Sequence, residues 1–319
     1  MEGVPPDSKG GFHMTNKMFN NESILSWLKY FSNNMTLDLE KVKLLDITGQ
    51  NQNLIPTVKT NRSVLVFTDA GHPEIFYSMW DAGLGNCDIW YNIGSDPVGE
   101  IKHNKLSEMI NRGINASAAM MVVNPDAQST YMVGLNNDSF SVGSIRYVAS
   151  EIRAIIMNKM SLDEEDVVCA ISGESIAVEA AIAVPYGKVI AVEYKNEDRI
   201  TMAENKAMFG LQNVKIIKSL EDGYPKSLPV PTVAFLVSSD RMDAELSSLL
   251  AVNPAIRIVV YTLEFDLLTR IPSLFRKHGI REMETLQIAI SKLGKKDMFE
   301  MQPAPWLTSG LAGASPSDL

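Results

Sequence analysis

The chain has 319 residues with 45% hydrophobic content, and its 38 acidic and 29 basic side chains give a formal net charge of −9. This length predicts two domains, since a domain typically holds about 100–200 residues. The acidic balance excludes a general nucleic-acid binder, because such binding needs clustered Lys and Arg. No apolar run reaches the roughly 18 residues of a membrane-spanning helix, so we predict no membrane span.

Cysteine and histidine usage excludes two further kinds of site. The two cysteines, Cys87 and Cys169, are too few for a disulfide framework, and Cys169 lies inside a predicted buried strand. This usage fits a reducing compartment, so we expect a cytoplasmic location. The four histidines are scattered without the spacing of metal ligands, so no metal site is expected.

The first part of the chain predicts a disordered leader followed by an α/β domain. Residues 1–20 begin with a stretch rich in Pro, Gly and Ser and form the leader. Residues 21–125 form the domain, and the polar, turn-rich stretch 126–142 forms a linker. Helices are expected at 23–31, 74–82 and 106–111, and strands at 42–47, 63–68, 88–92 and 118–123.

The second domain, at 143–305, is organised around residues 166–197. A short apolar run ends in the turn Ser172-Gly173-Glu174-Ser175, and an apolar helix and a second apolar run ending at Glu193 follow. This order is typical of a βαβ unit in a buried parallel sheet. In nucleotide-binding sheets the ligand lies at such a turn, and an acid after the second strand can hold a ribose. The alternative is an ordinary α/β core in which Glu193 is a chance acid.

The rest of this domain alternates between strands and helices, which predicts a doubly wound sheet. Helices are expected at 144–160, 198–209, 242–250 and 265–278, and strands at 214–217, 232–237, 257–261 and 284–290. The fold class is therefore α/β with two domains. Residues 306–319 are mostly small or polar and are expected to form a mobile tail.

Short motifs in a fixed order connect this chain to a known family. The motifs in the second domain are Glu151-Ile152-Arg153-Ala154, Glu179-Ala180-Ala181, Phe209-Gly210-Leu211-Gln212-Asn213-Val214, Thr262-Leu263-Glu264 and Met298-Phe299-Glu300. Those in the first are Val66-Phe67-Thr68-Asp69, Gly83-Leu84-Gly85 and Trp90. With these motifs the chain resembles the precorrin-6Y C5,15-methyltransferases of cobalamin biosynthesis. The resemblance implies a partial tetrapyrrole-methylase-like domain followed by a class I, Rossmann-like methyltransferase domain.

The resemblance also implies a set of site residues. Gly173 and Ser175 at the turn, Glu193 on the ribose and Glu221 near the adenine would hold S-adenosylmethionine, and Thr262 and Glu264 would be catalytic. Simpler roles exist for some of them. Glu193 can cap the helix that begins near residue 196, and Thr262 and Glu264 can start the helix that follows them.

The chain departs from the family where the cofactor would bind. The family's loop D-x-G-A-G-T-G-S is about two residues shorter here and keeps one glycine, Gly173. Glu174 places a carboxylate where the cofactor's own carboxylate would lie, and like charges repel in a poorly solvated site. The front half of a tetrapyrrole methylase, with its own cofactor loop, is also missing.

Two hypotheses follow. In the first, the chain is a degenerate relative that has lost or weakened cofactor binding and acts as a binding or scaffold protein, with a tetrapyrrole, another small molecule or a protein as its partner. In the second, it is an active decarboxylating C-methyltransferase that uses S-adenosylmethionine on a corrin precursor. Either protein is expected to form a homo-oligomer.

Overall fold

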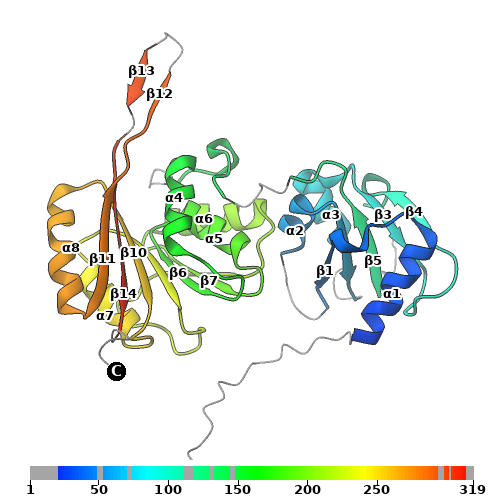
Figure 1. Ribbon diagram of the computed structural model, residues 1–319, viewed down its shortest axis with the longest axis horizontal. Helices are drawn as coiled ribbons and strands as arrows, with labels where there is room; N and C mark the ends of the chain where they lie inside the picture. Colours follow the sequence, from blue (N-terminus) through cyan, green and yellow to red (C-terminus); the bar gives the residue numbers. More distant parts are fainter. Residues whose placement is uncertain are drawn as a thin grey trace, which may run out of the picture.

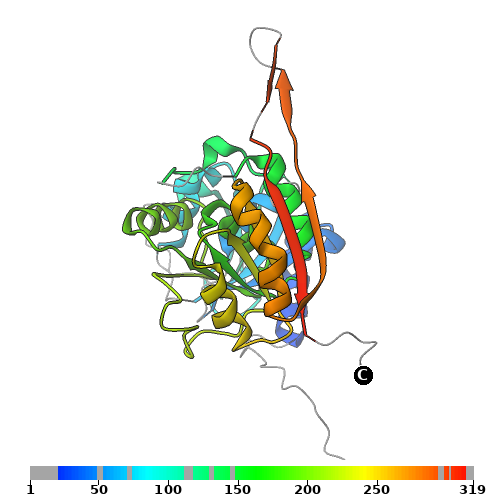
Figure 2. The same cartoon turned by 90° about the vertical axis from the view of Figure 1, so that its left-hand side faces the viewer.

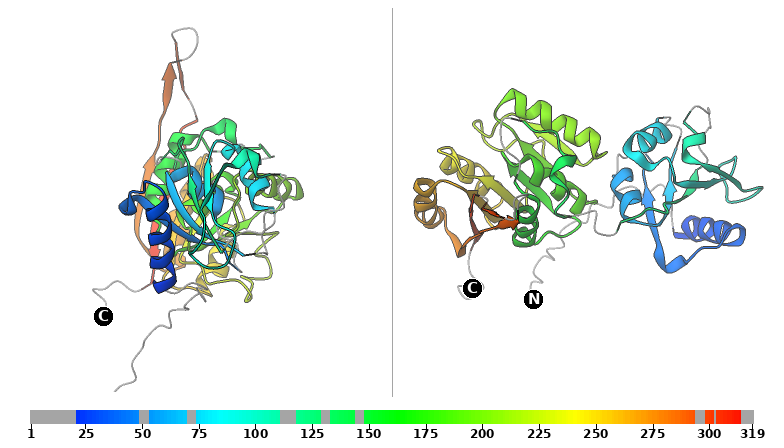
Figure 3. Two further views of the ribbon diagram at one scale, coloured as in Figure 1. Left: turned by 90° about the vertical axis from the view of Figure 1, so that its right-hand side faces the viewer. Right: turned by 90° about the horizontal axis from the view of Figure 1, so that it is seen from above.

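The computed structural model describes residues 21–48, 53–69, 74–110, 118–128, 133–143, 148–293, 298–301 and 303–313. The predicted leader lies outside these residues, as do parts of the predicted elements at 106–111 and 144–160 and the end of the predicted tail. Two sheets, in separate halves of the molecule, organise the described chain (Figures 1 and 3). The fold class is α/β, as predicted. None of the helices in the described ranges is long and apolar enough to cross a membrane.

The first sheet has five strands in the order β1-β2-β5-β3-β4, with β1 and β2 parallel and the other pairs antiparallel. The strands are β1 (Val42–Asp46), β2 (Ser63–Phe67), β3 (Asp88–Tyr91), β4 (Lys102–Lys105) and β5 (Ala119–Val123). The helices are α1 (Asn21–Asn34), α2 (Leu54–Thr60) and α3 (Ile75–Met79), which continues as a π-helical turn (Trp80–Leu84). Short 3₁₀ turns lie at Leu39–Lys41 and Leu106–Glu108. Apolar side chains of α1 cover one face of this sheet, and those of α2 and α3 cover the other.

The second sheet has seven strands in the order β11-β14-β10-β9-β6-β7-β8. The strands are β6 (Val167–Ile171), β7 (Lys188–Val192), β8 (Val214–Ile217), β9 (Val233–Val237), β10 (Arg257–Thr262), β11 (Ile280–Gln287) and β14 (Trp306–Ala312). The helices are α4 (Ser150–Met160), α5 (Glu174–Ala183), α6 (Asn196–Met208), α7 (Met242–Leu250) and α8 (Phe265–Lys277). A 3₁₀ turn (Asn137–Ser139) precedes α4, and a separate hairpin joins β12 (Ser291–Leu293) to β13 (Phe299–Met301).

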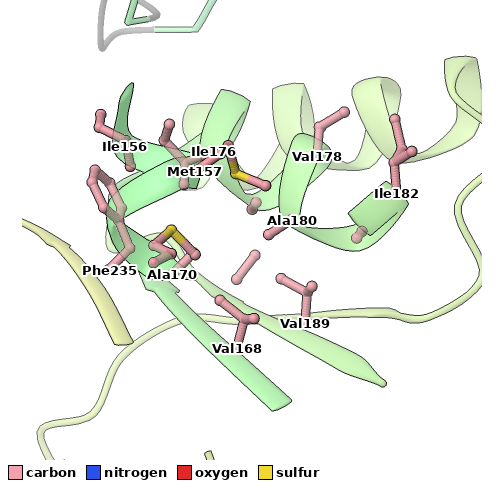
Figure 4. Close-up of a cluster of buried hydrophobic side chains, with 14 of the residues drawn as sticks. Ile156, Met157, Val168, Ala170, Ile176, Val178, Ala180, Ile182, Val189 and Phe235 are labelled. Atoms are coloured by element: carbon pink, nitrogen blue, oxygen red, sulfur yellow. The ribbon is translucent and has the colours of Figure 1, made fainter. Parts of the chain in front are cut away.

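Helices cover both faces of this sheet. Side chains of α4, α5 and α6 pack on one face and those of α7 and α8 on the other. Figure 4 shows the first of these layers, where Ile176, Val178 and Ala180 of α5 meet strand residues such as Val168 and Val189. Because α5 is apolar nearly all round, it can be stable only where neighbours bury every side of it.

The expectation of a mobile tail is wrong for residues 306–312. They form β14, which pairs antiparallel with both β10 and β11. Small residues are needed there, because a Cβ at Gly310 would lie 2.6 Å from the Ile280 side chain and 3.0 Å from the Phe275 ring. Small size therefore reflects close packing inside a sheet, and not a turn or a free end.

A buried asparagine docks the first half of the chain onto the second. Asn53, which is 2% exposed and precedes α2, donates through Nδ2 to the Ala181 carbonyl and to Asn213 Oδ1, both at 2.9 Å. Its Oδ1 accepts from the Gln212 backbone N–H at 2.8 Å. Ile55 of α2 packs against Gly210, where a side chain would have no room. The motif residues 210–213 therefore serve to join the two halves.

We expect Asn53→Ala to loosen this joint. The substitution leaves the buried Asn213 side chain and the Gln212 N–H short of a partner, at a cost of about 2 kcal/mol. Small-angle scattering should show a larger radius of gyration, and denaturant unfolding should become less cooperative. Asn61→Ala is the matched control, because within the described part of the chain the Asn61 side chain bonds its own helix end, at Thr57 and Thr60. Equal effects from both variants would contradict a docking role.

Candidate functional site

The turn after β6 is closed and tight. Ser172 has a positive φ of 53°, and Gly173 follows it at the N-cap position of α5. A Cβ at Gly173 would lie 2.6 Å from the ring of Phe235 on β9. Packing against Phe235 is therefore sufficient to require a glycine here, independent of any ligand. Ser175, in the first turn of α5, is buried.

Glu174 is the first residue of α5 and is partly exposed. Its Oε1 accepts a hydrogen bond from Asn205 Nδ2 on α6 at 2.5 Å. Burial raises the pKa of the Glu174 carboxyl to about 7, and the negative charges of Asp198 and Glu204 add to the rise, while the Asn205 hydrogen bond opposes it. A carboxyl with this pKa is only partly ionised at neutral pH.

Glu193 follows β7 and is 1% exposed, and its Oε1 has no hydrogen-bond partner. Burial and, to a smaller extent, the nearby charges of Glu174 and Asp198 raise its pKa to about 8 against the opposing charge of Arg199. The Arg199 guanidinium donates to the backbone carbonyl of Glu193 at 2.8 Å. The N-cap position of α6 belongs to Lys195, so the simpler role predicted for Glu193, that of helix cap, is wrong.

The backbone of residues 141–143 lies against α6. The Ser141 N–H donates to Asn205 Oδ1 at 2.8 Å, and Asn205 Nδ2 donates back to the Ser141 carbonyl at 3.0 Å. Gly143 lies so close to α6 that a Cβ would be 2.9 Å from Asp198 Oδ1 and 3.1 Å from Thr201 Oγ1. Asn205 therefore connects the predicted linker to Glu174.

A buried ion pair anchors this segment. Arg153 and Glu179 have fully buried side chains, and Arg153 Nε donates to Glu179 Oε1 at 2.6 Å. Glu179 also accepts from the backbone N–H groups of Gly134 and Leu135, both at 2.9 Å. Arg153 bonds further to the carbonyls of Leu135 and Val148, and its guanidinium lies 4.7 Å from the Phe140 ring centroid. Two of the family-like motifs thus meet in a structural contact.

Three other predicted site residues make contacts of their own. Thr262 is buried, and its Oγ1 accepts the Glu264 N–H at 3.1 Å, so it helps to start α8. Glu264 itself is exposed. Glu221 is also exposed, with its carboxylate 4.0 Å from Arg241 Nε. Among the described residues, no hydrogen bond or ion pair connects any of the three to Glu193.

The structure adds a buried acid, Glu245, that the sequence analysis missed. Tyr194 donates its hydroxyl to Glu245 Oε1 on α7 at 2.7 Å, and Glu245 Oε2 is buried without a partner. Burial raises the pKa of Glu245. The Arg241 guanidinium lies 4.7 Å from the Tyr194 ring centroid. The sequence contains one signal for this contact. Successive side chains of a strand point to opposite faces of the sheet, so Tyr194 should face the side opposite Glu193, where α7 packs.

Glu174, Glu193 and Asp198 make the site acidic and poorly solvated. No group of acidic, histidine or cysteine side chains in the described residues could hold a metal ion. A buried carboxylate without a partner is suited to accept a hydrogen bond from a hydroxyl or an amine. The same carboxylates disfavour an anionic group beside them.

Comparison with known proteins shows the fold of the second half. No protein-family model matches the chain, and no curated protein matches it either. The precorrin-6Y C5,15-methyltransferase of Geobacter metallireducens superposes with a TM-score of 0.53 at 20% identity, over 57% of this chain and 98% of its own. The precorrin-8W decarboxylase of Methanobacterium thermoautotrophicum has a TM-score of 0.49 at 20% identity, over 56% and 98%. By its superposition on the Geobacter protein, the seven-stranded mixed sheet has the Rossmann-like fold of class I methyltransferases.

Proposed function

We propose that the chain is a degenerate relative of the precorrin-6Y methyltransferases that acts as a binding or scaffold protein. The observation that carries the proposal is the Glu174 carboxyl at the turn, close enough to Glu193 to raise its pKa. Glu193 can accept the hydroxyl of a nucleoside ribose, whereas Glu174 repels the carboxylate of S-adenosylmethionine. These residues fit the nucleoside end of that cofactor and do not fit its amino-acid end.

Other residues support the same proposal. Thr262 helps to start α8, and Glu264 is exposed beside it, so neither residue needs a catalytic role to explain its presence. Their catalytic role stays a prediction. Three further expectations stay predictions: that the first half resembles a tetrapyrrole methylase, that the ligand is a tetrapyrrole, and that the protein is cytoplasmic.

Titration calorimetry with S-adenosylhomocysteine tests the proposal. We expect no saturable binding by the wild-type chain up to millimolar ligand, because the ligand's carboxylate must approach Glu174. Saturable micromolar binding that Glu193→Gln abolishes would contradict the proposal. It would favour the alternative, an active decarboxylating C-methyltransferase on a corrin precursor. The presence of Glu193 at the position expected for the ribose acid supports that alternative.

A scaffold needs a surface for association, and the β12–β13 hairpin provides an apolar one. Figures 1 and 2 show it projecting beyond the body of the second half. Leu293, Met298 and Phe299 on it are exposed, Phe299 to 73%. Exposed apolar side chains on a projecting hairpin are typical of association surfaces.

We expect the chain to form a homo-oligomer through this hairpin. Light scattering should give a multiple of the chain mass for the wild type and a smaller assembly for the double variant Leu293→Ser/Phe299→Ser. Leu25→Ser is a matched control, since Leu25 is an exposed leucine on α1, in the other half of the chain. A monomeric wild type, or dissociation by the control alone, would contradict this expectation.

A further inference from the structure

Acidic side chains gather at the start of α5 and along α6. Glu174, Glu193, Asp198 and Glu204 act on one another across the start of α5 and along α6. Arg199 is the cation that acts on Glu193, and its guanidinium is bonded to the backbone carbonyls of residues 193 and 194 and to Asn196 Oδ1. Arg199 is therefore engaged with other acceptors, and it does not pair with the Glu193 carboxylate.

The two glutamates differ in exposure. Glu193 Oε1 is buried without a partner. Glu174 is partly exposed, and its Oε1 accepts a hydrogen bond from Asn205. An unpartnered buried carboxylate oxygen favours any donor that can reach it. The two carboxyl groups therefore offer one acceptor at the solvent side of the turn and one buried oxygen without a partner.

We propose that Glu174 selects ligands by charge, so that the site takes a nucleoside that carries an ammonium group and no carboxylate. An ammonium has three donors and no acceptor, so it can bond Glu174 while the ribose hydroxyls donate to Glu193. An ion pair in a poorly solvated site is stronger than one in water. This inference rests on the proposed function, because it assigns a ligand class to the site that has lost its fit for S-adenosylmethionine.

Three adenosine compounds test the selection by titration calorimetry. They are 5′-amino-5′-deoxyadenosine, which has the ammonium alone, adenosine, which has neither group, and S-adenosylhomocysteine, which has both an ammonium and a carboxylate. For the wild type we expect the amine to bind about tenfold more tightly than adenosine, and S-adenosylhomocysteine to bind more weakly than adenosine. The advantage of the amine should grow from pH 6 to pH 8, as Glu174 ionises.

Glu174→Gln removes the charge and keeps the shape. We expect it to bring the amine and adenosine to within about threefold of each other and to improve binding of S-adenosylhomocysteine. Glu204→Gln is the matched control, because it removes an exposed charge that acts on Glu174 without being at the turn. It should keep most of the preference for the amine. Thermal unfolding of both variants checks that they are folded.

The outcomes separate the two proposals. If adenosine binds and S-adenosylhomocysteine does not, but the amine is no better than adenosine, the charge selection is wrong and the proposed function stands. If S-adenosylhomocysteine binds as tightly as the amine, both are wrong. If none of the three compounds binds, the site does not hold a nucleoside and the ligand class is wrong.

Discussion

Replacing Arg153 by methionine is expected to destabilise the second half of the chain by about 3–5 kcal/mol, among the largest effects that a single substitution can have. The variant leaves Glu179 in a fully buried position without its cation. It also removes the donors to the carbonyls of Leu135 and Val148 and the contact with Phe140. Urea unfolding of the wild type and variant measures the change.

The double variant Arg153→Met/Glu179→Gln is the control for this prediction. It removes the orphaned charge, and the one amide oxygen of a glutamine can still accept from either Gly134 or Leu135, whose N–H groups bond different oxygens of Glu179. We expect it to recover at least half of the lost stability, because the cost of the single variant comes mainly from the uncompensated carboxylate. A double variant as unstable as the single one would instead locate the cost in the arginine's other contacts.

The Arg153–Glu179 pair also explains why family-like motifs are weak evidence of activity. Both side chains belong to such motifs, and they hold the predicted linker onto α4 and α5. Motif residues 210–213 likewise dock α2. A chain that had lost its chemistry would still need these contacts to fold. The retained motifs therefore support the fold and leave the activity open.

The sequence predicted the buried strands well. It predicted poorly the segments that contain proline or many small residues, such as α2 and β14. Strands such as β6, β7 and β8 are apolar, β-branched runs, and such runs are strong signals of a buried sheet. Helix α2 was missed because residues 54–60 are buried on several sides and contain a proline, so they show no helical periodicity. Strand β14 was missed because its Ser and Gly residues imitate a turn. In both segments, packing against distant parts of the chain decides the structure.

At the site, the sequence identified the positions but not their physical state. Glu174 and Glu193 were singled out from the turn and from the end of the second run. Their mutual repulsion, the link from Asn205 to Ser141, and the missing partner of Glu193 depend on how α5, α6 and the linker meet. These are contacts between residues far apart in the chain, and no local pattern encodes them.

The buried acids also predict an unusual dependence of stability on pH. The pKa of Glu193 in the folded chain is about 8, above its ordinary value of 4.5, so the folded state binds more protons than the unfolded state between these two values. The free energy of unfolding should therefore be highest near pH 5 and fall as the pH rises to about 8. The raised pKa values of Glu174 and Glu245 act in the same direction. Asp88 and Asp243, whose pKa values are lowered, act only in more acidic solution.

Glu193→Gln is expected to remove much of this slope. At pH 8 the variant should be more stable than the wild type by about 2–4 kcal/mol, because it no longer ionises a buried carboxyl, and at pH 5 the two should agree within about 1 kcal/mol. Chemical denaturation at several pH values measures both differences. Glu164→Gln, which changes an exposed glutamate, should run parallel to the wild type. If Glu193→Gln also runs parallel, Glu193 is stabilised as an anion in the folded chain, and the acidic site has a cation that offsets its charge.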